Sequence, residues 1–280
     1  MTKKFRNYLT GLMAVTFLVS SVLLAVQMMD SRQAQQAAQA AQDLAVSSVQ
    51  ESEPLPPVEV ELPEPGVPLA AEPAEEVIPP APLSEDSVHL LDLDLDALRQ
   101  VSSDVLGWIS IPGTEVDYPL LALNNNRDGL TRTWDGKKSS AGSIFLECKN
   151  QRDFSDFNTL IYGHYMKNGT MFGSLKHYAQ PDYLAEHPFV YIVTEDSVRR
   201  YEVFSAYEAS VVSDTYRLYF EDDARRQSSL DHYVNSASVD TGIIPEVDDN
   251  ILTLSTCMGN GTYDTRWVVQ AVLEAQFPRT

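Results

Sequence analysis

The chain has 280 residues and a formal net charge of −20, from 40 acidic and 20 basic side chains. Binding to a nucleic-acid backbone needs clustered cations, so this excess of carboxylates argues against a nucleic-acid partner. The two cysteines, Cys148 and Cys257, are too few for a disulfide framework. They either form a single bridge or leave Cys257 unpaired for a functional role, and we favour the second interpretation.

A membrane anchor is expected within residues 1–30. Three basic residues, Lys3, Lys4 and Arg6, precede an uncharged and mostly apolar run over residues 7–29. Twenty-odd helical residues, each rising about 1.5 Å, span a hydrocarbon core of about 30 Å. Small residues suited to signal-peptidase cleavage do not follow the run closely. We therefore expect an uncleaved, single-pass anchor in the cell membrane, with the N-terminus in the cytoplasm and the rest of the chain outside.

Residues 31–88 are predicted to form an extracellular stalk. The Ala/Gln-rich residues 33–44 are expected to continue as a helix for a few turns. Residues 51–87 then hold ten of the sixteen prolines, and residues 51–86 hold ten acidic residues and no Lys or Arg. Proline fixes φ and removes a donor, and like charges repel, so this stretch should be an extended, unpacked spacer.

Residues 89–280 have the composition of a single folded domain. Apolar and β-branched runs bounded by Gly, Pro and Asn predict strands, and runs of good helix formers predict helices. Many strands with a few inserted helices indicate a mostly antiparallel barrel or sandwich. Strands are expected over residues 105–111, 116–121, 143–147, 159–162, 189–194, 199–212, 251–256 and 267–273, and helices over residues 90–103, 171–178, 182–186 and 224–234.

The last predicted hairpin brings a cysteine and an arginine together. The strand over residues 251–256 is followed by Cys257, and the next strand begins near Arg266 after a segment with two glycines. The strand ends of a hairpin lie side by side, and neighbouring strands are about 4.8 Å apart. Cys257 and Arg266 are therefore expected within side-chain reach of each other.

This pair of residue types suits nucleophilic attack on an amide carbonyl. A thiolate is the reactive nucleophile, and a nearby cation lowers the pKa of a thiol. Arginine offers several donors in a fixed fork to the oxyanion that forms, and the backbone N–H of Met258 is a second candidate donor. A histidine is then needed to protonate the departing amine.

Among the five histidines, His164 is the strongest candidate, because it alone lies at the end of a predicted strand. Residues at strand ends are held rigidly by the scaffold. His177 and His232 lie in polar, helix-like segments and His187 precedes a proline at a turn, so surface roles suit them better. From position alone, a purely structural role for His164 also remains open.

Several motifs resemble those of the sortases, and of class B in particular. The resemblance covers most of residues 90–275, and it implies a mostly β fold. We expect a sortase-type eight-stranded barrel with an N-terminal helix and a further helix inserted between two late strands, within residues 213–242. The motifs are VLGWISIPGT (105–114), DGKKSSAGSIFL (135–146), IYGHYMKNGTMFGSL (161–175), TLSTC (253–257) and Arg266.

The resemblance also implies an activity. A membrane-anchored cysteine transpeptidase of this class cleaves an Asn-Pro-x-Thr-like sorting signal after its threonine and holds the threonine as a thioester on Cys257. A peptidoglycan amine or a pilin lysine then resolves the thioester. The implied partners are surface proteins that carry a C-terminal sorting signal, and no metal or cofactor is expected. By similarity the catalytic residues are His164, Cys257 and Arg266, and the substrate-binding residues are Ser255, Met258 and Tyr216.

Three alternatives remain beside a wall-anchoring sortase. A pilin-polymerising sortase would use a lysine as its acceptor. A cysteine peptidase would hydrolyse its thioester, which product analysis with and without an amine would reveal. An inactive surface-binding domain on a stalk would have no need of His164, Cys257 and Arg266 together. Cys148 is expected to be a packed or edge thiol.

Overall fold

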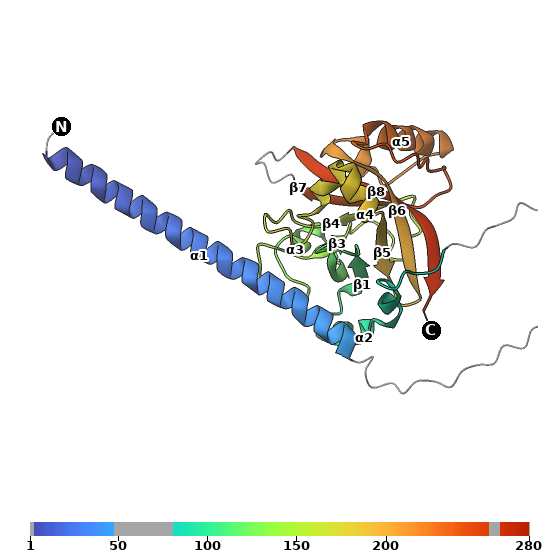
Figure 1. The fold of residues 1–280 in the computed structure, drawn as a ribbon, viewed down its shortest axis with the longest axis horizontal. Helices are drawn as coiled ribbons and strands as arrows, with labels where there is room; N and C mark the ends of the chain where they lie inside the picture. Colours follow the sequence, from blue (N-terminus) through green and yellow to red (C-terminus); the bar gives the residue numbers. More distant parts are fainter. Residues whose placement is uncertain (1–2, 48–80, 258–263, 280) are drawn as a thin grey trace, which may run out of the picture.

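The computed structural model describes residues 3–47, 81–257 and 264–279. Eight strands close into a barrel in the order β1-β2-β3-β4-β7-β8-β6-β5 (Figure 1). All neighbouring pairs are antiparallel except β2–β3 and β4–β7, which are parallel. The expected eight-stranded, mostly antiparallel barrel is therefore confirmed. The strands are β1 (Val105–Ser110), β2 (Asp117–Ala122), β3 (Ile144–Leu146), β4 (Asn158–Tyr162), β5 (Phe189–Val193), β6 (Ser197–Ser210), β7 (Ile251–Cys257) and β8 (Thr265–Pro278).

The interior of the barrel is filled by aliphatic side chains from facing strands. Each of them is fully buried, and they belong to one contiguous cluster. Burying a side chain of this size stabilises the fold by about 1.5–3 kcal/mol. This core fixes the strands whose ends carry the candidate site. Members from five strands are Ile109, Leu120, Ile161, Leu252 and Val269.

Short helices lie in the connections between strands. The helix α5 (Asp223–Ser236) occupies the long β6–β7 connection and covers part of the outside of the barrel (Figure 1). Its N-cap is Asp222, whose carboxylate accepts a hydrogen bond from the backbone N–H of Arg225. The helix predicted over residues 224–234 is thus confirmed. The helical elements after residue 81 are η2 (Val88–Asp92), α2 (Leu95–Val101), α3 (Asn126–Gly129), η3 (Leu175–Ala179), α4 (Pro181–Glu186), η4 (Asp214–Tyr216) and α5 (Asp223–Ser236).

Two helix predictions need correction. The single helix expected over residues 90–103 is two pieces, because Leu93 is extended and the Asp94 side chain caps the backbone N–H of Ala97, which starts α2 afresh. The helix expected over residues 171–178 begins only at Leu175. Met171 has φ of 53°, in the left-handed region, and therefore cannot open a right-handed helix.

The N-terminal helix α1 (Lys3–Ser47) is continuous, and its last third packs on the barrel (Figure 1). Ala41 and Ala45 are fully buried there, and Nε2 of Gln42 donates to the backbone carbonyl and the carboxylate of Asp117. The helix predicted over residues 33–44 is thus confirmed. Residues 51–80 of the predicted Pro-rich spacer lie outside the described residues. Its last residues, 81–87, are not unpacked as expected, because Arg200 holds their first two carbonyl oxygens and Ser87 is fully buried.

The membrane anchor expected in residues 1–30 finds no support in the structure. In the part of the chain that is described, no helix combines the length and the apolar character needed to cross a membrane.

Ala81 and Pro82 are hydrogen-bonded to strand β6 of the barrel. The guanidinium of Arg200 donates hydrogen bonds to the carbonyl oxygens of Ala81 at 2.8 Å and Pro82 at 3.2 Å. Arg200 is itself buried and pairs with the carboxylate of Glu274. From these contacts the chain continues into η2 and α2. Their buried leucines, Leu90, Leu95 and Leu98, pack with barrel residues in one cluster at this end of the barrel.

Candidate active site

The three predicted catalytic positions lie at one end of the barrel. In the antiparallel pair β7–β8, Cys257 lies opposite Arg266, so the predicted hairpin neighbours are confirmed. In the parallel pair β4–β7, Tyr162 aligns with Ser255, and the N–H of Gly163 donates to the Ser255 carbonyl at 3.2 Å. β7 continues two residues past Ser255 to Cys257, and the chain continues two residues past the end of β4 to His164. Cys257 is therefore paired with Arg266 of β8, and the two residues before it, Ser255 and Thr256, line one cavity together with His164.

A cavity of about 250 Å³ lies at this end. Three of the predicted residues line it: His164, Ser255 and Arg266. The side chain of Cys257 and the whole of Met258, the predicted second oxyanion donor, lie outside the described residues. The remaining lining residues, which the sequence interpretation did not single out, are Asn126, Leu130, Phe145, Tyr162, Gly163 and Thr256.

His164 is half-buried and its ring is oriented by a neighbouring loop. Nε2 lies 2.9 Å from the carbonyl oxygen of Leu130. A carbonyl only accepts hydrogen bonds, so in this arrangement Nε2 carries the proton that it donates to Leu130. Gly142 packs against the ring: a Cβ at this position would lie 3.0 Å from Cδ2 of His164 and 2.4 Å from the carbonyl oxygen of Gly129. A larger residue there would displace the ring or the loop.

Ser255, which lines the cavity, is in contact with Tyr216, which lies behind it and does not line the cavity. Oη of Tyr216 lies 2.9 Å from Oγ of Ser255. Tyr216 belongs to η4 in the β6–β7 connection, and Ser255 is two residues before Cys257 on β7. The long insertion therefore reaches the strand that carries the candidate nucleophile.

The position of η4 is fixed by the carboxylate of Asp214. It accepts hydrogen bonds from Nε of Arg217 at 2.9 Å and from Oγ of Ser229 at 2.9 Å, and it pairs with the guanidinium of Arg225. Burial would raise the pKa of Asp214, but the hydrogen bonds from Arg217 and Ser229 and the charges of Arg217 and Arg225 outweigh it, so the pKa lies below the ordinary carboxyl value. The ionised carboxylate ties the start of α5 to η4.

A second anchor of η4 is the fully buried amide of Asn158. Its Nδ2 donates to the carbonyl oxygens of Thr215 at 3.1 Å and Arg217 at 3.0 Å. Its Oδ1 accepts from Oγ1 of Thr253 at 2.7 Å, and Nε2 of Gln270 donates to the same hydroxyl at 3.1 Å. These buried hydrogen bonds join η4 to β4, β7 and β8 beneath the cavity, and each would be costly to leave unmade.

The opposite wall holds a polar cluster around Glu147, which is nearly fully buried. Its Oε2 accepts from Nδ2 of Asn126 at 2.7 Å and from the hydroxyl of Tyr162 at 3.2 Å. Burial, together with the charge of Glu147, raises the pKa of Tyr162, so its hydroxyl stays protonated and donates. Of these residues only Tyr162 gave a signal in the sequence, because it lies in the motif that ends at His164.

Cys148 follows this cluster at the surface. It is a free cysteine, so the single-bridge alternative does not hold. Its Sγ lies 3.4 Å from Oε1 of Glu147, and its backbone N–H donates to Oδ1 of Asn126 at 2.9 Å. Among the residues the structure describes, no group of His, Cys, Asp and Glu side chains is arranged to hold a metal ion.

A sequence model of the sortase domain matches residues 109–274. The chain belongs to the sortase family. It is 36% identical to Sortase B of Listeria monocytogenes over 188 residues, which are 64% of this chain and 74% of that protein. It is 29% identical to Sortase B of Staphylococcus aureus over 174 residues, which are 62% of this chain and 71% of that protein.

Solved sortase B structures share the fold. The Staphylococcus aureus sortase B–substrate complex matches with a TM-score of 0.61 at 29% identity, over 64% of this chain and 83% of that one. A sortase B from B. anthracis in complex with AAEK1 matches with a TM-score of 0.66 at 26% identity, over 88% of this chain and 99% of that one. This sortase is therefore a cysteine transpeptidase of the sortase B type.

Proposed function

We propose that this sortase cleaves an Asn-Pro-x-Thr-type sorting signal after its threonine, holds the threonine as a thioester on Cys257 and transfers it to a peptidoglycan amine. The observation that supports this most directly is the cavity lined by both His164 and Arg266, at the end of the barrel where Arg266 pairs with Cys257. The similarity to a sortase B whose structure holds a substrate supports a sorting signal as the ligand of the cavity.

Acylation would start with the thiolate of Cys257. Its Sγ attacks the carbonyl carbon of the threonine, a C–S bond forms, and the carbonyl π electrons move onto the oxygen. Arg266, which lines the cavity, and the N–H of Met258 are the proposed donors to this oxyanion. When the intermediate collapses, the C–N bond breaks and His164 gives its proton to the leaving nitrogen.

Deacylation would repeat the same steps with an amine. The amine nitrogen attacks the thioester carbon, His164 takes up the proton of that nitrogen, and the C–S bond breaks to return the thiolate. An amine acceptor is supported by a further sortase B structure, 30% identical to this chain, that is complexed with triglycine. The proposed acceptor here is an amine of the cell-wall precursor.

The substrate threonine would lie against Ser255 and Tyr216. Their hydroxyls are 2.9 Å apart on the wall formed by β7 and η4. A threonine hydroxyl beside them could exchange donor and acceptor roles with either one. We propose that this wall selects the residue before the scissile bond.

The test is an acylation assay on the full chain. The chain is incubated with a peptide that contains Asn-Pro-Gln-Thr, and its intact mass is read beside that of Cys257→Ala. The proposal predicts a mass gain equal to the acyl fragment, absent in Cys257→Ala and released as a conjugate when a peptidoglycan-type amine is added. Release by water at the same rate with and without the amine would indicate a peptidase, and release only by a pilin lysine peptide would indicate pilus assembly. Absence of any adduct across a panel of sorting signals would overturn the proposal.

The family places the enzyme at the cell surface. The finer location, a single pass with the N-terminus in the cytoplasm, rests on the sequence alone, on the three basic residues that precede the uncharged run over residues 7–29. Fractionation of cells that express the whole chain or residues 31–280 tests it. The whole chain should sediment with membranes and the shortened chain should not, and equal release of both would count against the anchor.

A further inference from the structure

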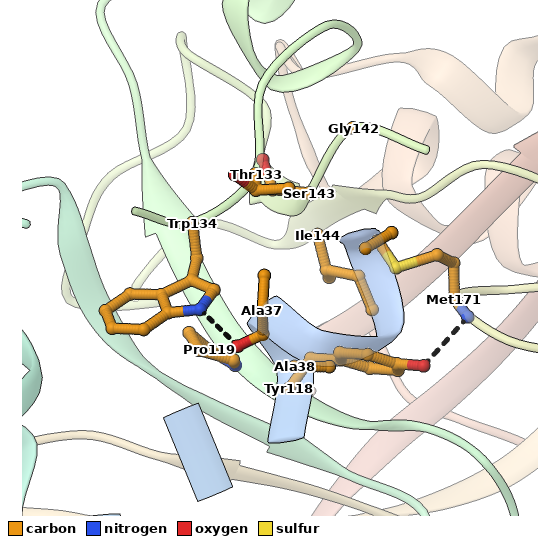
Figure 2. Close-up of a pocket in the computed structure, with 11 residues that line it drawn as sticks. Ala37, Ala38, Tyr118, Pro119, Thr133, Trp134, Gly142, Ser143, Ile144 and Met171 are labelled. Atoms are coloured by element: carbon orange, nitrogen blue, oxygen red, sulfur yellow. Dashed lines mark hydrogen bonds between the residues drawn. The ribbon is translucent and has the colours of Figure 1, made fainter. Parts of the chain in front are cut away.

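Helix α1 contacts the two segments that surround His164. Ala37 and Ala38 of α1 line a small cavity of about 20 Å³ together with Trp134 and Met171 (Figure 2). Trp134 belongs to the loop that precedes β3, and Met171 belongs to the hairpin-like turn that follows β4. The loop contacts the candidate catalytic His164, and the turn begins at His164.

The first segment is the loop over residues 129–143. Its Trp134 is nearly fully buried, and Nε1 donates to the carbonyl oxygen of Ala37 at 2.7 Å (Figure 2). The same loop supplies Leu130, whose carbonyl oxygen faces Nε2 of His164 at 2.9 Å, and Gly142, whose Cα packs against the ring. Backbone hydrogen bonds within the loop, such as Ser139 N–H to the Thr131 carbonyl and Ser143 N–H to the Gly129 carbonyl, connect the segment that holds the indole with the segment that contacts the imidazole.

The second segment is the turn over residues 164–172. It is closed by the N–H of Phe172, which donates to the carbonyl oxygen of His164 at 3.1 Å. Met171 is held in the left-handed region, with φ of 53°, and its N–H donates to the hydroxyl of Tyr118 at 3.1 Å (Figure 2). Tyr118 is nearly fully buried beside Ala38. The turn that begins at His164 is thus fastened to a tyrosine that helix α1 covers.

The face of α1 that makes these contacts consists of alanines at helical spacing, Ala34, Ala37, Ala38, Ala41 and Ala45. Small side chains let the helix backbone approach closely, which brings the Ala37 carbonyl within hydrogen-bond reach of the indole. We propose that residues 34–45 of α1 are a positioning element for His164, which acts through Trp134 and Tyr118. This inference rests on the proposed catalytic role of His164.

The experiment compares three conservative variants of the full chain. Trp134→Phe keeps an aromatic side chain, although a smaller one, and removes the donor to Ala37. Tyr118→Phe removes the acceptor of the Met171 N–H. The control is Tyr178→Phe, which removes the hydroxyl of another buried tyrosine; this hydroxyl donates to the carbonyl oxygen of His187 at 2.7 Å, and Tyr178 does not line the cavity beside helix α1. For each variant we would measure kcat and KM with the sorting peptide, the thermal unfolding temperature, and the NMR signal of the His164 ring.

Misplacing a catalytic group by about 1 Å can lower the rate about 100-fold, so partial loss of one support should lower kcat about tenfold. The expected result is such a loss in Trp134→Phe and Tyr118→Phe with KM unchanged, a shifted His164 ring signal, and an unfolding temperature no lower than that of Tyr178→Phe. Rates and ring signals that match Tyr178→Phe would overturn the inference. If the unchanged chain performs no acyl transfer, the proposed function fails, whereas the His164 ring signal still decides whether helix α1 positions that residue.

Discussion

The hydroxyl of Tyr216 and the hydroxyl of Ser255 lie 2.9 Å apart, across 39 positions of the sequence. This contact joins the β6–β7 connection to the strand that ends in Cys257. The connection therefore contacts a residue that lines the candidate active-site cavity, and it is not only an external cover. Changes in it should alter substrate binding more than the chemical step.

Tyr216→Phe should raise KM for the sorting peptide about three- to tenfold and leave kcat within about twofold. The substitution removes one hydroxyl, and a hydrogen bond of this kind contributes about 0.5–1.5 kcal/mol. Steady-state kinetics over a range of peptide concentrations measure both constants. The control is Tyr219→Phe in the same connection, because the Tyr219 side chain is 72% exposed and should tolerate the change. A loss confined to kcat would show that Tyr216 serves the chemistry instead.

Arg266→Lys should lower kcat about 100-fold. Lysine keeps the charge but lacks the fork of donors, and the loss of one oxyanion donor typically costs a factor of about 10² to 10³. Single-turnover acylation, followed by intact mass, measures the first step directly. Arg132→Lys makes the same chemical change at an exposed position and serves as the control. A variant with normal acylation but slow release would assign Arg266 to the second step alone.

The sequence predicted the Cys257–Arg266 pair because a hairpin is local: seven residues form β7, and the partner strand begins eight positions after Cys257. The position of His164 next to this hairpin could not be derived in the same way. It depends on the parallel pairing of β4 with β7, whose paired residues are 93 positions apart, as in Tyr162 and Ser255. Propensity and periodicity describe single strands and do not specify which distant strands pair.

The supports of the site were also beyond the sequence. Leu130 contributes a backbone carbonyl, which every residue type has, so no pattern marks it. Asn158 stands at the start of β4, and its hydrogen bonds to Thr215, Arg217 and Thr253 depend on segments that meet only in the fold. The packing of helix α1 was missed because alanines are good helix formers and small, and their burial shows only when a partner surface is present.

Asp214→Asn should destabilise the protein by about 1–2 kcal/mol at pH 7, since hydrogen bonds to a charged group contribute about 1.5–3 kcal/mol and this carboxylate is partly exposed. The pKa of Asp214 lies below that of an unfolded carboxyl, about 3.9. Its stabilising effect is therefore present above pH 3.9 and is lost as the pH falls through the folded-state value. Denaturant unfolding at several pH values should show that the difference in unfolding free energy between the unchanged protein and Asp214→Asn decreases from pH 5 to pH 2.

The control for this series is Asp248→Asn, at an exposed position in the same connection. It should show a small difference at every pH. If the Asp214→Asn gap stays constant down to pH 2, the pKa of Asp214 is not lowered by its arginine partners.

Although Cys148 is exposed, it should react with iodoacetamide at pH 7 more slowly than an exposed cysteine with an ordinary pKa. Desolvation, the hydrogen bond to Glu147 and the charge of Glu147 raise the pKa of its thiol, and only the thiolate reacts. Alkylation is followed by mass in a Cys257→Ala background, so that one thiol is counted. In Glu147→Gln the midpoint of the pH dependence should fall and the rate at pH 7 should rise. An unchanged midpoint would show that Glu147 does not control this thiol.

The pH dependence of kcat/KM should be bell-shaped, because the proposed mechanism needs Cys257 as a thiolate and His164 with its proton. Ordinary thiols ionise near pH 8.5 and ordinary imidazoles near pH 6.5, so with such groups only about 1% of the enzyme would hold both charges, at a pH of about 7.5. Turnover should accordingly be slow. Initial rates from pH 5 to 10 measure the profile, and His164→Asn gives the comparison. Its residual rate should rise with thiolate formation and not fall again, because no proton on residue 164 remains to be lost. A monotonic rise in the unchanged protein would mean that the leaving nitrogen takes its proton from elsewhere.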